Sequence, residues 1–405
     1  MNILVQKYGG TSVATKESRK LVVEKVLNAK NQGKSVVVVV SAMGRKPEPY
    51  ATDSLLNLIE QINPDINARE RDALMSCGEN LAAVVITAEL LANGCDAVSI
   101  TGGQAGIVTT DVFGDARIKG IDTKRLMSTL KASKVAVVTG FQGITEDGDI
   151  TTLGRGGSDT TATALGAALD AELVEIYTDV EGIMTADPRV VPDAKYQKTV
   201  SYRDLVEMAN LGAKVIHPRA VEIAMKKKVP LAIKNTFSDA PGTFVIEAYE
   251  EIDAPQNLDN VVSAVANMSG VAQIKSVEEA FKSTNKVLSV FETLANENIS
   301  VDMINVFTDR MHFIVDEKDL ARTIDILENM KVNVEATKGC AKVSVVGSGM
   351  MDIPGVMSRF VKALDGAGVK ILQTSDSNNS LSCLVVAEDM EKAARALHSE
   401  FKLSE

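Results

Sequence analysis

A run of five consecutive valines, Val36 to Val40, constrains the fold of this chain more than any other segment. Valine is β-branched and fits extended backbone, and a strand without polar alternation is typical of one buried on both faces. Such strands form mostly parallel sheets, which need helices packed against both sides. The run therefore predicts the central strand of a three-layer αβα sandwich.

Short β-rich segments alternate with helical patterns over about the first 245 residues, as such a sandwich requires. The other expected strands are Ile3 to Gln6, Ala97 to Ile100, Val135 to Thr139, Val174 to Thr178 and Leu231 to Lys234. The expected helices include Leu55 to Ile62, Leu81 to Leu91, Thr160 to Leu169 and Tyr202 to Asn210. The fold class is α/β, with a mostly parallel sheet in a catalytic domain spanning residues 1–245.

The composition and periodicity of the chain change after this domain. Residues 246–260 are polar, aperiodic and contain Pro255, which is typical of a linker. Beyond it, VLSVF from Val287 matches VMSRF from Val356, 69 residues later. This spacing fits a duplicated ferredoxin-like (βαββαβ) domain and is too long for a solenoid repeat. We expect the two copies over residues 261–335 and 336–405, either in sequence or interleaved.

Composition narrows the possible functions. The 405 residues carry 54 acidic and 43 basic side chains, a net charge of −11, which argues against an extended nucleic-acid surface. The four cysteines and three histidines are scattered without a CxxC pair, so neither a zinc site, a disulfide framework nor histidine chemistry is indicated. No apolar run reaches the ~18 residues of a membrane span, and the N-terminus lacks a signal-peptide stretch. We expect a cytoplasmic protein that binds neither nucleic acid nor membrane and holds no dedicated metal.

Four glycine-rich segments lie at strand ends or loops of the first domain: KYGGTSV from Lys7, TLGRGGSDTT from Thr152, TDVEGIMTADPR from Thr178 and GAKVIHP from Gly212. Amides at glycine turns and helix N-termini bind anions, and lysine adds a charge for them. The paired glycines after the first strand fit a tight turn equally well.

Arg155 offers a fork for a carboxylate inside a glycine loop. Ser158 and Asp159 fit two roles, capping the following helix or contacting substrate. No Walker A loop and no protein-kinase signature set occurs. Two lysines and an arginine–glycine loop, without a base and nucleophile pair, describe phosphoryl transfer, which chiefly needs positioning and charge neutralisation.

Seven motifs in this order resemble the aspartokinases: KYGGTSV, SAMG, ATDSLL, SCGE, TTLGRGGSDTTA, TDVEGIMTADPR and GAKVIHPRA. The likeness covers the whole chain and is greatest to the short monofunctional aspartokinases of Gram-positive bacteria, particularly their diaminopimelate-responsive isozymes. It implies the amino-acid kinase fold followed by tandem ACT domains. The implied reaction is ATP-dependent phosphorylation of the β-carboxylate of L-aspartate, the first step toward lysine through diaminopimelate, threonine and methionine.

The resemblance also assigns nucleotide contacts. Lys7, Gly9 and Gly10 match positions that hold the transferring phosphates, and Lys7 would stabilise the transition-state charge. The further implied nucleotide contacts are Thr178, Asp179, Asp187, Arg189 and Lys214. Mg²⁺ would enter with ATP and bridge its phosphates, without a dedicated cage of protein ligands.

The implied aspartate site joins five residues. Thr52 and Glu79 match substrate-binding positions, with Glu79 facing the ammonium group. Arg155 matches the carboxylate clamp, with Ser158 beside it, and Asp159 helps to organise the catalytic centre. The β-carboxylate of aspartate is already an anion at neutral pH, so it can attack phosphorus without a general base.

The duplicated tail resembles effector-binding ACT domains that pair across subunits, so we expect a homodimer or larger assembly. The second copy keeps a proline–glycine turn at MDIPGV, whereas the first copy lacks one. The implied effector positions are Ser283, Asn285, Lys286, Val287, Val301 and Asp302. Lysine and meso-diaminopimelate are the leading candidate effectors, followed by threonine, although one copy could serve only to build the dimer.

Two alternatives remain at this point. The chain could be another carboxylate kinase of the same fold, such as an acetylglutamate or glutamate 5-kinase. It could also be a catalytically silent amino-acid sensor that uses only its tandem repeats.

Overall fold

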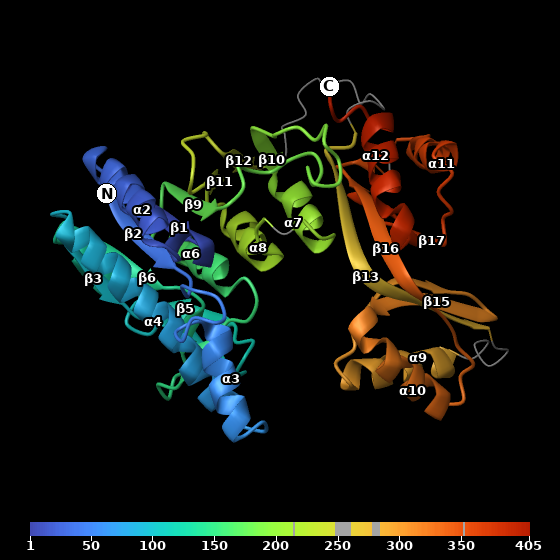
Figure 1. The fold of residues 1–405 in the computed structure, drawn as a ribbon, viewed down its shortest axis with the longest axis horizontal. Helices are drawn as coiled ribbons and strands as arrows, with labels where there is room; N and C mark the ends of the chain where they lie inside the picture. The colour runs from blue at the N-terminus through green and yellow to red at the C-terminus, as the bar shows by residue number, and fades with distance from the viewer. Residues whose placement is uncertain (214, 248–260, 278–283, 351–352) are drawn as a thin grey trace. The chain divides into compact units, whose positions relative to one another are not determined.

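The computed structural model describes residues 1–213, 215–247, 261–277, 284–350 and 353–405 (Figure 1). These divide into two compact units. Unit 1 comprises Met1–Ile183, Tyr196–Ala209 and residues 215–247, and unit 2 comprises Met184–Lys195, Asn210–Ala213 and the described residues from 261 onward. Each unit has its own sheet and apolar core.

Unit 1 is built around an eight-stranded sheet in the order β10-β12-β11-β9-β1-β2-β6-β3. Neighbouring strands are parallel except β11 with β12. The valine run lies in β2, and Val36 to Val40 are all fully buried, which confirms the predicted interior strand. The strands are β1 (Ile3–Tyr8), β2 (Ser35–Val40), β3 (Ala97–Ile100), β6 (Val135–Thr139), β9 (Leu173–Thr178), β10 (Thr199–Ser201), β11 (Leu231–Asn235) and β12 (Thr243–Ile246).

Helices cover both faces of this sheet. Val36, Val38 and Val40 join an apolar cluster with α2 and α4, because alternate residues of a strand face the same side. On the opposite face, Val174 of β9 packs closely against Gly166 of α6. The helices of this unit are α1 (Gly10–Val13), α2 (Lys16–Asn31), α3 (Thr52–Ile62), α4 (Ala68–Ala92), α5 (Lys124–Lys131), α6 (Gly157–Ala168), α7 (Tyr202–Asn210) and α8 (Pro218–Lys227).

A second sheet of unit 1 has four short strands in the order β5-β4-β7-β8. Strands of three or four residues show no clear period, so this sheet was not predicted from the sequence. Its strands are β4 (Ile107–Thr109), β5 (Ile118–Ile121), β7 (Gln142–Ile144) and β8 (Ile150–Thr152).

Helix α4 is the one described helix that is long and apolar enough, by length and hydropathy alone, to cross a membrane. Core helices of soluble proteins pass the same test, and 44% of its most apolar window is buried inside the structure. It also carries two buried carboxylates, Asp72 and Glu79. This combination is typical of a helix that packs on a sheet and lines a site.

Unit 2 is built on an antiparallel six-stranded sheet in the order β14-β15-β13-β16-β18-β17. Strands β13 (Ala264–Val277) and β16 (Glu335–Val346) run side by side through its whole length (Figure 1). One half of this pair adjoins β14 (Val301–Val306), β15 (Arg310–Asp316), η2 (Glu317–Asp319), α9 (Thr284–Asn296) and α10 (Leu320–Asn329). The other half adjoins α11 (Val356–Gly366), β17 (Gln373–Asp376), β18 (Ser380–Val386), η4 (Ala387–Asp389) and α12 (Met390–Glu400). The two halves therefore share two strands.

A segment of the first 245 residues packs within unit 2. Ala186, Val190 and Val191 join the apolar cluster of α11 and α12. Thr185 Oγ1 lies 2.9 Å from His398 Nε2, and Arg395 donates a 2.7 Å hydrogen bond to the carbonyl of Val190. The range 1–245 therefore does not form one contiguous unit, because these side chains find their apolar partners in the C-terminal helices.

Candidate active site

A pocket of about 390 Å³ opens on unit 1 beside the glycine loop that precedes α6. It brings together all six of the residues predicted for catalysis and aspartate binding: Lys7, Thr52, Glu79, Arg155, Ser158 and Asp159. Its remaining lining residues are Ser41, Met75, Gly114, Phe141, Thr152, Gly154, Gly156 and Gly157. These residues come from β1, β8, α3, α4, α6 and the loops between them, so the fold gathers groups far apart in the sequence.

Lys7 and Asp159 form a charge pair in this pocket. Lys7 Nζ lies 2.6 Å from Asp159 Oδ1, and each side chain is 12% exposed. Asp159 lies in the first turn of α6, where the helix dipole favours an anion. No donor in the described part of the chain is oriented to form a hydrogen bond with Oδ1. Electrostatic attraction between the two charges, rather than a directional hydrogen bond, therefore holds the Lys7 ammonium group there.

Glu79 supplies a buried and incompletely satisfied carboxylate. Its Oε1 accepts a 3.0 Å hydrogen bond from the amide of Ala42, whereas Oε2 is buried and has no partner among the described residues. Burial raises the pKa of Glu79 to about 7, and the hydrogen bond from Ala42 opposes this rise. A buried acceptor without a donor is rare in native proteins, so this oxygen is suited to receive a cationic ligand.

In contrast to the buried carboxylate of Glu79, Arg155 is exposed and places a positive charge on the wall of the pocket. No hydrogen bond or ion pair involves its side chain within the described ranges. The flanking residues Gly154 and Gly156 have φ of +71° and +67°, a region that L side chains rarely adopt. A side chain at Gly156 would also collide with His217, so the loop needs glycine at this position. The guanidinium is therefore presented on a tightly constrained turn and is free to bind an anion.

Asp72 is a residue of this region that the sequence analysis missed. Its carboxylate is 1% exposed and accepts three hydrogen bonds, from the amides of Gly114 and Thr152 and from the Thr152 hydroxyl. The sequence did not point to Asp72, because the charged run ARERD at the start of α4 is typical of a solvent-exposed helix surface. Only the tertiary structure brings the two loops onto it.

The residues predicted to contact nucleotide fall into two groups. Gly9, Gly10, Thr178 and Asp179 lie at the carboxyl ends of β1 and β9, which are adjacent parallel strands. Asp187 and Arg189 belong to the segment of unit 2 described above, where they pair at 2.7 Å. Hydrogen bonding to the guanidinium lowers the pKa of Asp187. Lys214 lies outside the described residues.

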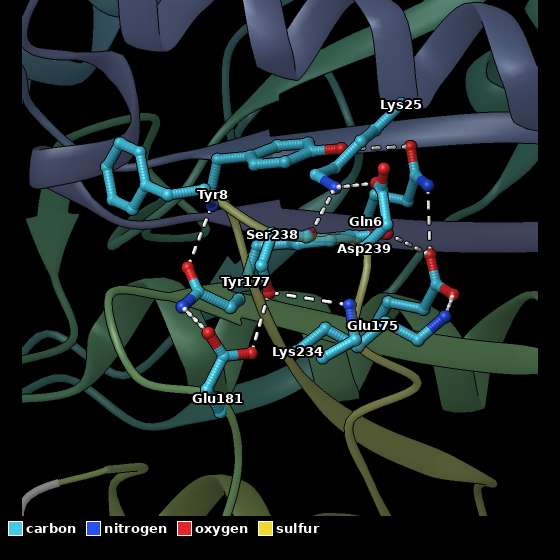
Figure 2. A network of polar contacts seen from close by, with 12 residues as sticks. Gln6, Tyr8, Lys25, Glu175, Tyr177, Glu181, Lys234, Ser238 and Asp239 are labelled. Carbon is cyan, nitrogen blue, oxygen red and sulfur yellow. Dashed lines mark hydrogen bonds and ion pairs between the residues drawn. The ribbon is translucent and has the colours of Figure 1, made fainter.

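A buried polar network on the α2 side of the sheet holds these strand ends together (Figure 2). Glu175 accepts hydrogen bonds from Gln6 at 2.9 Å, Tyr177 at 3.1 Å and Lys234 at 2.6 Å. The rings of Tyr8 and Tyr177 stack with centroids 4.8 Å apart. Burial, followed by the negative charge nearby, raises the pKa of Tyr177, so its hydroxyl remains a donor.

The same network extends to the loop after β9. Ser238 donates a 2.6 Å hydrogen bond to one oxygen of Glu181 (Figure 2), and Asn235 donates a 3.0 Å hydrogen bond to the other. Lys25 of α2 bonds the carbonyl of Ser238 and the carboxylate of Asp239. Three strands, α2 and the TDVEG segment are therefore fixed to one another next to the glycine turn of β1.

The residues predicted for effector binding lie in the half of unit 2 that contains β14. Asp302 forms a 2.6 Å ion pair with Lys342 and a 2.6 Å hydrogen bond with the amide of Met303. Lys286 Nζ donates to the carbonyl of Met330. Asn285 is exposed, Val287 and Val301 are partly buried, and Ser283 lies outside the described residues.

The described residues contain no cluster of three or more histidine, cysteine or acidic side chains that could hold a metal ion. In the pocket, Asp159 is the carboxylate closest to Lys7. One carboxylate fits a Mg²⁺ ion that arrives already bound to phosphates, because Mg²⁺ commonly keeps water and substrate oxygens as ligands.

Comparison with known proteins places these features in a family context. Residues 2–235 match the amino acid kinase family, and residues 335–399 match an ACT domain. The chain is 46% identical over 404 residues to Aspartokinase 1 of Bacillus subtilis, covering 100% of both chains. It is 42% identical over 411 residues to the aspartokinase of Geobacillus stearothermophilus, covering 100% of this chain and 98% of that protein.

Solved structures agree with these sequence relatives. The structure is similar to E. coli aspartokinase III in complex with aspartate and ADP (R-state), with a TM-score of 0.79 and 26% identity over 98% of this chain and 99% of that one. It is also similar to the same enzyme in complex with lysine and aspartate (T-state), with a TM-score of 0.78 and 26% identity over 99% and 100% of the two chains.

Proposed function

The chain belongs to the aspartokinase family, as an aspartate kinase with an ACT domain, and we propose that its unit 1 pocket carries out the phosphorylation of L-aspartate. ATP would donate its γ-phosphoryl group to the β-carboxylate, giving 4-phospho-L-aspartate and ADP. The E. coli relative solved with aspartate and ADP supports this substrate pair.

One observation carries the substrate assignment: a buried anion and an unpaired cation line the same pocket. Among the described residues, one carboxylate oxygen of Glu79 has no hydrogen-bond donor, and the guanidinium of Arg155 has no hydrogen-bond or ion-pair partner. An α-amino acid presents an ammonium group and a carboxylate that complement these two charges. In our proposal Glu79 binds the ammonium group and Arg155 clamps the carboxylate, with Thr52 and Ser158 beside them.

The remaining groups suit phosphoryl transfer. A β-carboxylate oxygen attacks the γ-phosphorus, a new P–O bond forms, and the bond to the bridging oxygen of ADP breaks. Lys7 neutralises the charge that builds on the transferring oxygens, and Asp159 holds Lys7 in place. The attacking group is already ionised, so no general base is required. Mg²⁺ bound with ATP would neutralise phosphate charge, and Asp159 would offer it a carboxylate ligand.

The nucleotide contacts follow the same proposal. Gly9 and Gly10 would offer backbone amides to the phosphates, and Thr178 and Asp179 would contact the nucleotide from the neighbouring strand end. Asp187, Arg189 and Lys214 are proposed as further nucleotide contacts from their motif positions alone.

Regulation by an end product is the second part of the proposal. An ACT domain and the E. coli relative solved with lysine and aspartate support an amino-acid effector. Asp302 is already neutralised by Lys342, so an effector ammonium group would have to compete with that side chain. We propose lysine, meso-diaminopimelate or threonine as the effector, a homodimer formed through the ACT region, and a cytoplasmic enzyme that opens the pathway to these products.

The test is ADP release by purified protein with ATP and Mg²⁺, measured with L-aspartate, N-acetyl-L-glutamate and L-glutamate in parallel. We expect ADP to form with aspartate alone, and to decrease when the correct effector is added. Activity with another substrate in place of aspartate would favour another kinase of this fold. Binding of an effector without any ADP formation would identify a silent sensor.

A further inference from the structure

Asp72 is a buried carboxylate for which the proposed reaction has no direct use. It lies in the second turn of α4 and is 1% exposed, yet no lysine or arginine pairs with it in the described part of the chain. Burying a charge without a cation is unfavourable unless hydrogen bonds compensate for lost hydration. Three donors do so here, at 2.9 Å from Gly114, 2.7 Å from the Thr152 amide and 2.8 Å from the Thr152 hydroxyl.

These donors belong to the loop at Gly114 and to the last residue of β8, which form part of the pocket wall. Gly114 and Thr152 both line it, and Thr152 precedes Arg155 by three residues. The same wall is held from the side of α8, where Arg219 donates 2.6 Å to the carbonyl of Leu153 and 2.8 Å to Asp115. Asp72 therefore anchors the loop that presents the Arg155 guanidinium.

Helix α4 also carries Glu79, seven residues after Asp72. Seven residues correspond to nearly two helical turns, so both side chains leave the same face about 10 Å apart along the axis. Helix α4 therefore rigidly connects Glu79, which is proposed to bind the ammonium group, with Asp72, which anchors the loop that carries Arg155.

We propose that Asp72 is a positioning residue that holds Arg155 at a fixed distance from Glu79. The α-carbon of the substrate is thereby fixed in the pocket, and the length of its side chain decides whether the second carboxylate reaches the transferring phosphate beside Lys7. This inference rests on the proposed function. Aspartate and glutamate carry the same α-ammonium and α-carboxylate groups, and their side chains differ by one methylene. Discrimination between them therefore depends on how firmly Glu79 and Arg155 hold the α-carbon relative to Lys7. A pocket that distinguishes one methylene typically gains about 10- to 200-fold.

The hydrogen-bond pattern provides a conservative variant. Both backbone amides bond Oδ2 of Asp72, and the Thr152 hydroxyl bonds Oδ1. In Asp72→Asn, the amide oxygen can accept both backbone bonds while its NH₂ group donates to the Thr152 hydroxyl, which also accepts. Asp72→Ala leaves all three donors without a partner. The asparagine variant should therefore retain the anchor that the alanine variant loses.

The experiment measures aspartate KM, ATP KM, and the Ki of L-glutamate as a competitor of aspartate in four variants. For Asp72→Ala we expect aspartate KM to rise about tenfold or more, ATP KM to stay within about twofold, and the ratio of glutamate Ki to aspartate KM to fall several-fold. Asp72→Asn should remain within about threefold of wild type for all three constants. Thr152→Val, which removes only the hydroxyl bond, should raise aspartate KM by about two- to fivefold.

Thr87→Val is the matched control, because Thr87 is a buried residue of α4 whose hydroxyl donates to the carbonyl of Ala83 in its own helix. It should leave all three constants unchanged. An aspartate KM and glutamate Ki that are unchanged in Asp72→Ala, or an equal rise of both KM values, would overturn the inference. If Asp72→Ala does not fold, an unchanged aspartate KM in Thr152→Val would overturn it instead. A wild-type protein that forms no ADP with aspartate would remove the proposed function itself, and the inference with it.

Discussion

The clearest consequence of the pocket is that Glu79→Gln should stabilise the ligand-free protein at alkaline pH while impairing substrate binding. The ordinary pKa of this carboxyl is 4.5, and burial raises it to about 7 in the folded protein. Between these pH values the folded state holds a proton that the unfolded state has released. Stability therefore falls as pH rises through this window, and the full loss is present above pH 7.

The size of this effect follows from the shift. Each pKa unit corresponds to 1.36 kcal/mol, so a rise from 4.5 to about 7 costs about 3 kcal/mol when Glu79 is ionised. Glutamine has the shape of the protonated acid and does not titrate. The E79Q variant should be within about 1 kcal/mol of wild type near pH 5 and more stable by about 3 kcal/mol near pH 8. For a unit of about 200 residues, this corresponds to a Tm roughly 6 to 12 °C higher.

The assay is thermal unfolding of both proteins without ligand at pH 5 and pH 8, followed by circular dichroism. Adding aspartate at pH 8 should raise the Tm of wild type and leave that of E79Q almost unchanged, because only the carboxylate attracts the ammonium group. Wild-type kcat/KM for aspartate should also fall about tenfold from pH 8 to pH 6 as Glu79 takes up its proton. A Tm difference between the two proteins that is the same at both pH values would refute this reasoning.

Three further substitutions test other parts of the site. Lys7→Ala should lower kcat about 100-fold or more with little change in aspartate KM, and a normal kcat would contradict its assigned role. Arg155→Ala should chiefly raise aspartate KM, by roughly tenfold or more, which steady-state kinetics at varied aspartate would detect. Gly156→Ala should lower kcat/KM for aspartate by about tenfold, because φ is +67° and the new methyl group meets His217. Gly148→Ala is its control: φ is +90° but nothing lies within 4 Å, so an equal loss there would show that backbone strain alone is responsible.

Much of unit 1 could be predicted because its signals are local. β3, β6 and α7 have the bounds expected from the sequence, since turn residues flank short periodic segments. Helix α4 begins 13 residues before the expected Leu81, because charged residues interrupt the apolar period of its first turns. Its burial there depends on loops that come later in the chain.

The motifs pointed to residues that line one pocket, but they did not show which polar atoms of these residues lack a hydrogen-bond partner. No sequence pattern reveals that one oxygen of Glu79 lacks a hydrogen-bond donor. This depends on which backbone amides reach the carboxylate in the folded chain, where the amide of Ala42 reaches only the other oxygen. The role of Asp72 was hidden for the same reason. In the tail, the spacing of the repeats indicated a duplication, but the sharing of β13 and β16 between the halves depends on strand pairing at long range.

The packing of Met184–Lys195 within unit 2 sets an order of events during synthesis. Val191 and Ala393 belong to the same apolar cluster but are separated by 202 positions in the chain. At about 5 to 20 residues per second, a ribosome needs roughly 10 to 40 s to make the intervening chain. Throughout this interval the apolar side chains of the segment have no α12 to pack against. The TADPR motif therefore reaches its final position only after α12 has been made.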